Sequence, residues 1–267
     1  MKNYNILLAL LLIVLACSAP KKETPEISGA YNMLRVTTRT DGNATVREGV
    51  QQLKIFTKQY MMYVLFDENN PDGTSFGIGT YVTRPGGITE HVIYSASGGT
   101  VNTTGGVYEL EIEMKPNGYQ QVINDVNEAG EEVISTELYE SVGTNSTSPL
   151  DGMWREIRTY NIEEGDTSLF TMTQYKAYFA GHFMYGHTFE DATTTGATHT
   201  GMGFGTFEMI GDTLTREVVT VSTYENSGRT YNIQIEFNGP DEYKQTITEE
   251  NGVKNVEIYR RMEKQPL

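Results

Sequence analysis

Four residues of one polar stretch carry side chains of the kinds that bind metal ions. His187, Glu190, Asp191 and His199 lie within "GHTFEDATTTGATHTG", and their nitrogen and oxygen donors are of the types that zinc accepts. Their spacing matches no known zinc site, and a solvated polar loop is the simpler interpretation. We therefore expect neither a metal ion nor a cofactor.

A histidine can also serve in catalysis or in ligand binding, and His182 is the strongest single candidate. His182 and His187 are five residues apart, so a regular strand points their rings to opposite faces. The chain holds no His-Glu-x-x-His motif and no phosphate-binding loop. We therefore assign no catalytic residue, and an enzyme ranks below a binding protein or a structural protein.

Aromatic and methionine side chains are the third chemical feature, because aromatic walls with hydroxyl groups suit an apolar or amphipathic small molecule. Ordinary core packing explains any one of these residues at least as well. The candidate ligand-lining residues are Tyr175, His182, Phe183, Tyr185, Tyr231, Phe237 and Tyr243, with Tyr60, Met62, Tyr81 and Tyr108 as their counterparts earlier in the chain.

The counterparts exist because the chain repeats itself. "GIGTY" at 77–81 matches "GFGTF" at 203–207, and Val92 then corresponds to Val218. Other matches follow in the same order, displaced by roughly 120 residues, which is far beyond the period of solenoid repeats. The sequence therefore predicts a duplicated domain, with a Gly-, Ser- and Thr-rich linker between the copies.

Each copy has the pattern of an all-β domain. Residues 231–237 alternate between apolar and polar side chains, the period of a half-buried strand. Short turn signals separate the segments, so neighbouring strands pair antiparallel. Eight strands remove their exposed edges by closing into an up-and-down barrel. The second copy is predicted to form strands at 153–161, 169–179, 182–189, 202–209, 214–222, 230–238, 242–248 and 253–262.

Glycines recur at alternate positions of one predicted strand in each copy. Gly201, Gly203 and Gly205 fall on one face, as do Gly77 and Gly79. Glycine inside a strand marks a sharp bend, which a closed barrel needs. The alternative is that the missing side chains leave room for a ligand.

A family resemblance follows from the two ends of the second copy. Gly152-Met153-Trp154 on the first strand and Arg260-Arg261 on the last resemble the lipocalin pattern, in which a Gly-x-Trp and a basic residue pack together at the closed end of the barrel. The resemblance implies a barrel-closing contact among Trp154, Arg260 and Arg261, stabilised by about 0.5–2 kcal/mol of cation–π attraction. The first copy departs from the pattern, because Tyr31 replaces the tryptophan.

The N-terminus predicts the location. "MKNYNILLALLLIVLAC" has an early lysine and an apolar run that is too short to span a bilayer as a helix. Val14-Leu15-Ala16-Cys17 resembles the lipobox of bacterial lipoproteins, which implies cleavage before Cys17 and lipidation of that residue. We therefore expect a lipid anchor in the bacterial cell envelope, and Ser18 resembles the residue that follows the anchor in outer-membrane lipoproteins.

These inferences combine into one prediction of domains and function. We expect a signal peptide at 1–16, a lipidated Cys17 and tether at 17–26, lipocalin-like barrels at 27–142 and 150–262, a linker at 143–149 and a tail at 263–267. The formal charge of −15 makes nucleic acid an unsuitable partner. The predicted function is binding of a small apolar or amphipathic ligand inside a barrel. The alternative is a structural or adaptor lipoprotein with filled barrels that contacts other envelope proteins.

Overall fold

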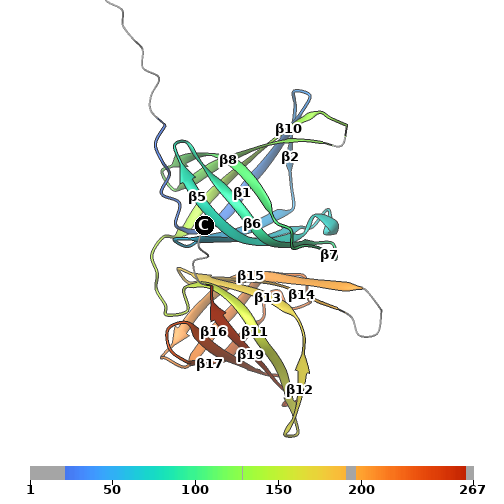
Figure 1. The fold of residues 1–267 in the computed structure, drawn as a ribbon, viewed down its shortest axis with the longest axis vertical. Coiled ribbons are helices and arrows are strands. Elements are labelled where there is room, and N and C mark those ends of the chain that lie inside the picture. The colour runs from blue at the N-terminus through green and yellow to red at the C-terminus, as the bar shows by residue number, and fades with distance from the viewer. Residues whose placement is uncertain (1–21, 128, 191–196, 263–267) are drawn as a thin grey trace, which may run out of the picture.

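The chain folds into two closed barrels, each made of eight antiparallel strands (Figure 1). The structure, a computed structural model, describes residues 22–127, 129–190 and 197–262. The predicted all-β fold with two tandem barrels is thus confirmed. Among the described residues, no helix has the length and apolar character needed to cross a membrane. Cys17 and the predicted signal peptide lie outside the described residues.

Barrel 1 is an antiparallel meander in which each strand pairs with the next along the chain and the last strand closes on the first. Two short strands, β2 (Asn43–Arg47) and β7 (Thr100–Asn102), and a 3₁₀ turn, η1 (Pro71–Gly73), lie outside this ring. The eight strands of the ring are β1 (Gly29–Thr40), β3 (Val50–Phe56), β4 (Tyr60–Asp67), β5 (Ser75–Arg84), β6 (Gly87–Ser97), β8 (Gly106–Lys115), β9 (Gly118–Val126) and β10 (Glu132–Gly143).

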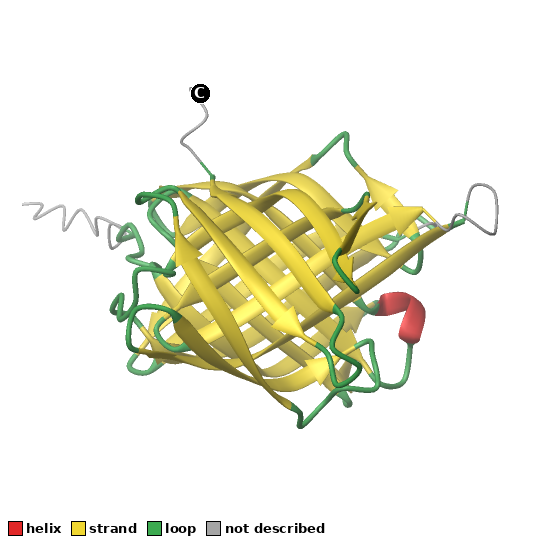
Figure 2. Cartoon of the chain, turned by 90° about the horizontal axis from the view of Figure 1, so that it is seen from below, coloured by secondary structure: helices red, strands yellow, loops and turns green. Residues whose placement is uncertain are grey.

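Barrel 2 repeats this topology and closes through the pairing of its last strand with its first. The strand predicted at 169–179 is in fact two, because β12 (Asp166–Phe170) pairs only with the distal part of the first strand and stays outside the ring. The strands of the ring are β11 (Gly152–Glu163), β13 (Thr173–Phe179), β14 (His182–Glu190), β15 (Thr198–Ile210), β16 (Leu214–Ser222), β17 (Thr230–Phe237), β18 (Glu242–Thr248) and β19 (Lys254–Arg261). Seen from below, the strands run obliquely around the barrel (Figure 2).

The glycines of β5 and β15 lie at a bend of the strand, and they also leave space that other side chains fill. The strand register shifts next to Gly79 and next to Gly205, so each copy has a β-bulge at the same place. A Cβ added at Gly77 would lie 2.6 Å from the ring of Tyr63, and one at Gly203 would lie 2.9 Å from the hydroxyl of Tyr185. Tyrosine rings from the neighbouring strand therefore occupy the space that these glycines leave.

The structural register corrects one of the repeat matches. Gly79 pairs with Val92 and Gly205 pairs with Val219, so Val92 corresponds to Val219 rather than to Val218. The difference arises in the preceding turn, which has two residues in barrel 1 and three in barrel 2. With the added residue allowed for, Glu90 corresponds to Glu217.

The two barrels share a hydrophobic core between their outer faces. Strands β13, β14 and β15 face barrel 1 (Figure 1). Phe76 packs where Gly186 has no side chain, and the hydroxyl of Tyr94 lies 2.5 Å from that of Thr188. The buried residues of this inter-barrel cluster are Ala30, Leu53, Ile55, Tyr60, Met62, Val64, Phe76, Ile78, Tyr94, Ala96, Met153, Tyr175, Ala177, Phe179, Met184, Met202, Phe204 and Val221.

Three of the predicted ligand-lining residues belong to this cluster. Tyr60, Met62 and Tyr175 are buried between the barrels, so the prediction that they line a barrel interior is wrong. The physical reason is that the strands at this interface are buried on both faces. Their apolar residues alternate as expected, but the apolar face points outward, against the other barrel.

Candidate functional site

The interior of each barrel contains the same six polar residues, each less than one-tenth exposed. The strand register places them at corresponding positions, two on the second strand of the ring and one or two on each of three later strands. In barrel 1 they are Gln52, Lys54, Glu90, Gln121, Glu137 and Tyr139, and in barrel 2 they are Gln174, Lys176, Glu217, Gln245, Glu257 and Tyr259.

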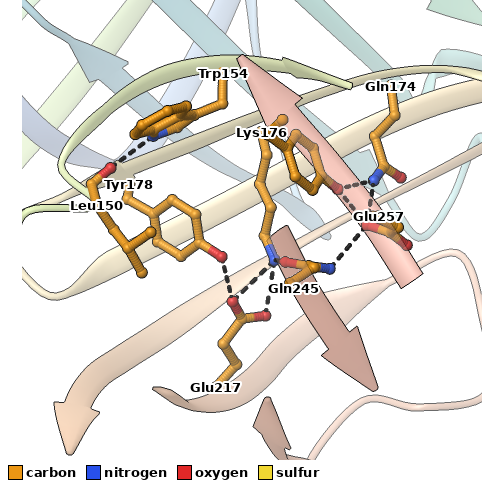
Figure 3. Close-up of polar contacts among 9 residues, drawn as sticks. Leu150, Trp154, Gln174, Lys176, Tyr178, Glu217, Gln245 and Glu257 are labelled. Atoms are coloured by element: carbon orange, nitrogen blue, oxygen red, sulfur yellow. Dashed lines mark hydrogen bonds and ion pairs between the residues drawn. The ribbon is translucent and has the colours of Figure 1, made fainter. Parts of the chain in front are cut away.

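In barrel 2 this polar network centres on a buried ion pair (Figure 3). Lys176 Nζ lies 2.9 Å and 3.2 Å from the two carboxylate oxygens of Glu217 and donates to Gln245 Oε1 at 3.2 Å. The Tyr178 hydroxyl donates to Glu217 Oε1 at 2.5 Å. Lys176 and Glu217 therefore form an ion pair with each other, and their other hydrogen bonds are to neutral groups.

Glu257 forms the second part of the network and is bonded to neutral groups. Its Oε2 accepts from Gln174 at 2.9 Å, from Gln245 at 2.8 Å and from the Tyr259 hydroxyl. Gln174 also donates to the Tyr259 hydroxyl. Burial raises the pKa of Glu257 above its ordinary value, and nearby Lys176 opposes the rise.

Barrel 1 repeats the arrangement. Lys54 Nζ lies 2.7 Å from Glu90 Oε1, and Gln121 donates to Glu137 at 2.7 Å. The Tyr139 hydroxyl donates to Glu137 at 2.6 Å. A buried ion pair with a second hydrogen-bonded carboxyl is therefore built into both copies.

Sequence reasoning missed this network, although its signal is present. Gln52 and Lys54 stand in "QQLKIF", and Gln174 and Lys176 stand in "TQYKAYF". A lysine in the middle of an otherwise apolar strand, repeated in both copies, is unusual because buried lysines require a partner. The partner glutamates come from strands far along the chain, so only the folded barrel brings them to the lysine.

Barrel 2 has a cavity of about 240 Å³ that is lined in part by this network. Its walls combine charged, polar, aromatic and aliphatic side chains. The lining residues are Gln174, Lys176, Phe183, Tyr185, His187, Glu217, Val219, Tyr224, Asn226, Tyr231, Ile233, Gln245, Ile247, Glu249, Asn255, Glu257 and Tyr259. Two larger hollows, of about 910 and 880 Å³, lie beside barrel 1 and are walled on one side by residues 22–28.

At four matched positions, the interior of barrel 2 carries a polar side chain where barrel 1 carries an apolar one. The pairs, barrel 1 first, are Met33 and Glu156, Val36 and Thr159, Leu65 and His187, and Ile88 and Thr215. Each pair places a polar side chain in barrel 2 where barrel 1 has an apolar one.

The remaining predicted ligand-lining residues lie in several different places. Phe183, Tyr185 and Tyr231 line the cavity of barrel 2, whereas Phe237 and Tyr243 pack in its core. Tyr81 packs in the core of barrel 1, where its hydroxyl donates to Thr57 O at 2.6 Å.

Two further candidates do not line an interior. Tyr108 is 48% exposed on β8, so the prediction for it is wrong. His182 stands at the β13–β14 turn, where its Nδ1 lies 3.1 Å from the carbonyl oxygen of Ala180, and it is not among the cavity-lining residues. Burial lowers the pKa of His182.

Trp154 is the centre of the contacts at the start of the first strand of barrel 2. The guanidinium of Arg261 lies 4.1 Å from the centre of the indole ring, and the indole N–H donates to the carbonyl oxygen of Leu150 at 2.7 Å. Arg261 also donates to backbone carbonyls of the chain that enters the barrel. Arg260 instead points outward and pairs with Glu242 at 3.2 Å.

In the described residues, neither the polar stretch nor the Gly-x-Ser-x-Gly spacing at 73–77 forms a site for chemistry. No group of three or more His, Cys, Asp or Glu side chains there is arranged to hold a metal ion, and Asp191 of the polar stretch lies outside them. Gly73 to Gly77 has the Gly-x-Ser-x-Gly spacing of hydrolase nucleophiles. Its Ser75 begins β5 and pairs with Ser97, however, rather than occupying the strand-to-helix turn that such a nucleophile requires.

His187 connects the cavity wall to the polar network. Its environment predicts that the stability of the fold depends on pH. Its Nδ1 lies 2.9 Å from Gln174 Oε1 and its Nε2 lies 2.6 Å from the Tyr224 hydroxyl. Burial lowers the pKa of His187 from 6.5 to about 4. Between these two pH values the unfolded chain binds a proton that the folded chain does not, so this contribution to stability is present above pH 6.5 and is lost as the pH falls to about 4.

We expect His187→Gln to remove this part of the pH dependence. Wild type should lose about 2–3 kcal/mol relative to the variant between pH 6.5 and pH 4, measured by urea unfolding at several pH values. The raised pKa values of Glu156 and Glu257 make stability increase as the pH falls, which is opposite to the effect of His187. This contribution is the same in wild type and in the variant. The difference in unfolding free energy between the two proteins therefore reports His187 alone. Parallel curves for the two proteins over this range would contradict the prediction.

Comparison with known proteins adds little to this geometry. No family model matches the chain, and no curated protein matches it. Among solved structures, the chain is similar to a crystal structure of a protein with unknown function from the DUF3598 family of Nostoc punctiforme. The identity is 11%, the match covers 88% of this chain and 96% of that one, and the TM-score is 0.27. A similarity at this level assigns neither a family nor a function.

Proposed function

We propose that this protein binds a small amphipathic molecule inside barrel 2. The cavity lined in part by the polar network carries the proposal, because it joins hydrogen-bonding groups at Lys176, Glu217 and Glu257 to an aromatic and aliphatic wall. Its volume of about 240 Å³ equals the share of roughly eight liquid waters. It is slightly smaller than the range of about 300–1,000 Å³ for drug-sized ligands, which favours a small ligand.

Barrel 2 rather than barrel 1 is the proposed binding barrel because of the polar substitutions in its interior. His187 faces the cavity, and the corresponding position in barrel 1 holds Leu65. A pocket that fixes a ligand's orientation needs a few polar groups among apolar ones. In this proposal barrel 1 supports barrel 2 through the shared inter-barrel core.

The lipid anchor completes the proposed function. Cys17 follows the segment that resembles a lipobox, and we propose that acylation there holds the two barrels at the cell envelope, at the outer membrane. A second acyl chain suits stable anchoring, because one chain alone binds membranes only marginally. The cavity would then take its ligand from the compartment beside that membrane.

The structural or adaptor alternative is favoured by a different observation. Leu169 is 71% exposed and Phe170 is 42% exposed on β12, which projects from barrel 2 (Figure 1). Contiguous exposed apolar surface marks sites of contact with other proteins. In this alternative the projecting ribbon binds another envelope protein.

Native mass spectrometry of the protein purified from cell envelopes tests the binding proposal. We expect wild type to retain a small molecule and Ile247→Trp to lose it, because the added ring would fill the cavity from its half-buried wall. Ile123→Trp, at the matching position of barrel 1, is the control and should retain the molecule. If wild type carries no small molecule but co-purifies with a protein through β12, the adaptor alternative holds instead.

A further inference from the structure

The charges that line the cavity of barrel 2 do not balance. Lys176 is the only lysine or arginine among the lining residues, whereas Glu217, Glu249 and Glu257 all line the cavity. Lys176 is 4% exposed and already bonds both oxygens of Glu217. It therefore has little capacity to attract an anionic ligand.

Glu257 is the buried cavity carboxyl that forms no direct ion pair with any described residue, although Lys176 lies near enough to oppose the rise in its pKa that burial causes. It is 8% exposed, and its three hydrogen bonds come from two amides and a hydroxyl, all to Oε2. Among the described residues, no ion pair includes Glu257. A buried carboxylate is costly without a counter-charge, so a cationic group in the cavity would stabilise its charged form.

Two asparagines of the cavity wall also present spare acceptors. Asn226 Oδ1 and Asn255 Oδ1 are buried without a hydrogen-bond donor in the described part of the chain. The side-chain amide N–H of Asn255 donates to Asn161 Oδ1 at 3.2 Å. The side-chain oxygen of Asn255 therefore points away from Asn161. Both of these buried, unpaired atoms of the cavity wall are acceptors, and they suit a ligand that donates.

An aromatic wall faces the same space. The ring of His187 stacks between Tyr185, with centroids 5.9 Å apart, and Tyr224, with centroids 5.8 Å apart. Because burial lowers the pKa of His187 to about 4, this wall carries no positive charge at neutral pH. The faces of tyrosine rings attract cations.

We infer that the molecule bound in barrel 2 is a small amine, which enters as its ammonium ion and donates hydrogen bonds to Glu257. This inference rests on the proposed function, because it names the chemical class of the ligand of the same cavity. The ammonium supplies the direct ion-pair partner that Glu257 lacks. Its remaining hydrogens reach the two asparagine oxygens, and the apolar body lies against the aromatic wall.

Three probes that share one apolar body separate amine recognition from general binding. Calorimetry at pH 7.5 with the full-length protein in mild detergent compares 2-phenylethylamine, 2-phenylethanol and phenylacetate. The amine should bind at least about tenfold more tightly than the alcohol, and phenylacetate should bind more weakly than the alcohol. Equal or tighter binding of the alcohol or of phenylacetate overturns the inference but leaves ligand binding intact.

Variants that change the charge of the cavity test whether the preference for the amine arises there. Glu257→Gln should bring the affinities for amine and alcohol to within about twofold of each other, whereas Glu137→Gln in barrel 1 should leave the preference unchanged. Asn226→Lys, on a loop at the cavity mouth, should weaken amine binding by about tenfold and strengthen phenylacetate binding, so the test does not depend on the folding of a core variant. Survival of the amine preference in both Glu257→Gln and Asn226→Lys overturns the inference.

The mass of any molecule retained by the purified protein tests the chemical class of the ligand independently. A retained mass with a basic nitrogen supports the inference, and one without a basic nitrogen overturns it while the proposed function stands. If nothing is retained and none of the three probes binds, the proposed function itself fails.

Discussion

Lys176→Met is expected to lower the free energy of unfolding by about 3–5 kcal/mol. Lys176 and Glu217 are 4% and 5% exposed, and their charged atoms lie 2.9 Å apart. Removing the lysine leaves the carboxylate of Glu217 buried with only the Tyr178 hydroxyl and no counter-charge. The measurement is urea unfolding followed by far-ultraviolet circular dichroism.

Two further variants show that the loss comes from the unpaired charge. The double variant Lys176→Met with Glu217→Gln should recover most of the stability, because a neutral amide still accepts from Tyr178. Lys244→Met removes a lysine that pairs with Glu236 at the surface of the same barrel, and it should cost less than about 1 kcal/mol. A loss for Lys176→Met no larger than that for Lys244→Met would show that the buried pair contributes little.

Phe76→Ala is the second variant with a large expected effect, about 3–5 kcal/mol of stability. Phe76 is fully buried, stacks on Tyr94 with ring centroids 5.9 Å apart and packs against Gly186 of the other barrel. The cavity left behind would weaken barrel 1 and its contact with barrel 2 at once. The two barrels should then cease to unfold as one cooperative unit.

The fluorescence of Trp154, the only tryptophan of the chain, provides the readout for barrel 2. In wild type, the fluorescence transition and the circular dichroism transition should coincide, and in Phe76→Ala they should separate. Val82→Ala is the matched control on β5, because Val82 is largely exposed and its loss should change stability by less than about 0.5 kcal/mol. Coincident transitions in Phe76→Ala would show that other contacts couple the barrels.

Much of the candidate site was beyond sequence reasoning, and β13 shows why. Tyr175 and Lys176 are neighbours on this strand, so they point to opposite faces. The sequence pattern predicts an aromatic interior that holds a ligand and places Tyr175 in it. The folded chain does the reverse, placing Tyr175 between the barrels and Lys176 inside barrel 2.

The duplicated all-β architecture was determined by the sequence itself, because alternation along a strand, tight-turn residues and repeated motifs are local properties. The tertiary structure decided which face of each strand is the inside. A strand buried on both faces has no local feature that distinguishes the barrel interior from the inter-barrel core. The partners of Lys176 and Glu257 also come from distant strands, so only closure of the ring brings them together.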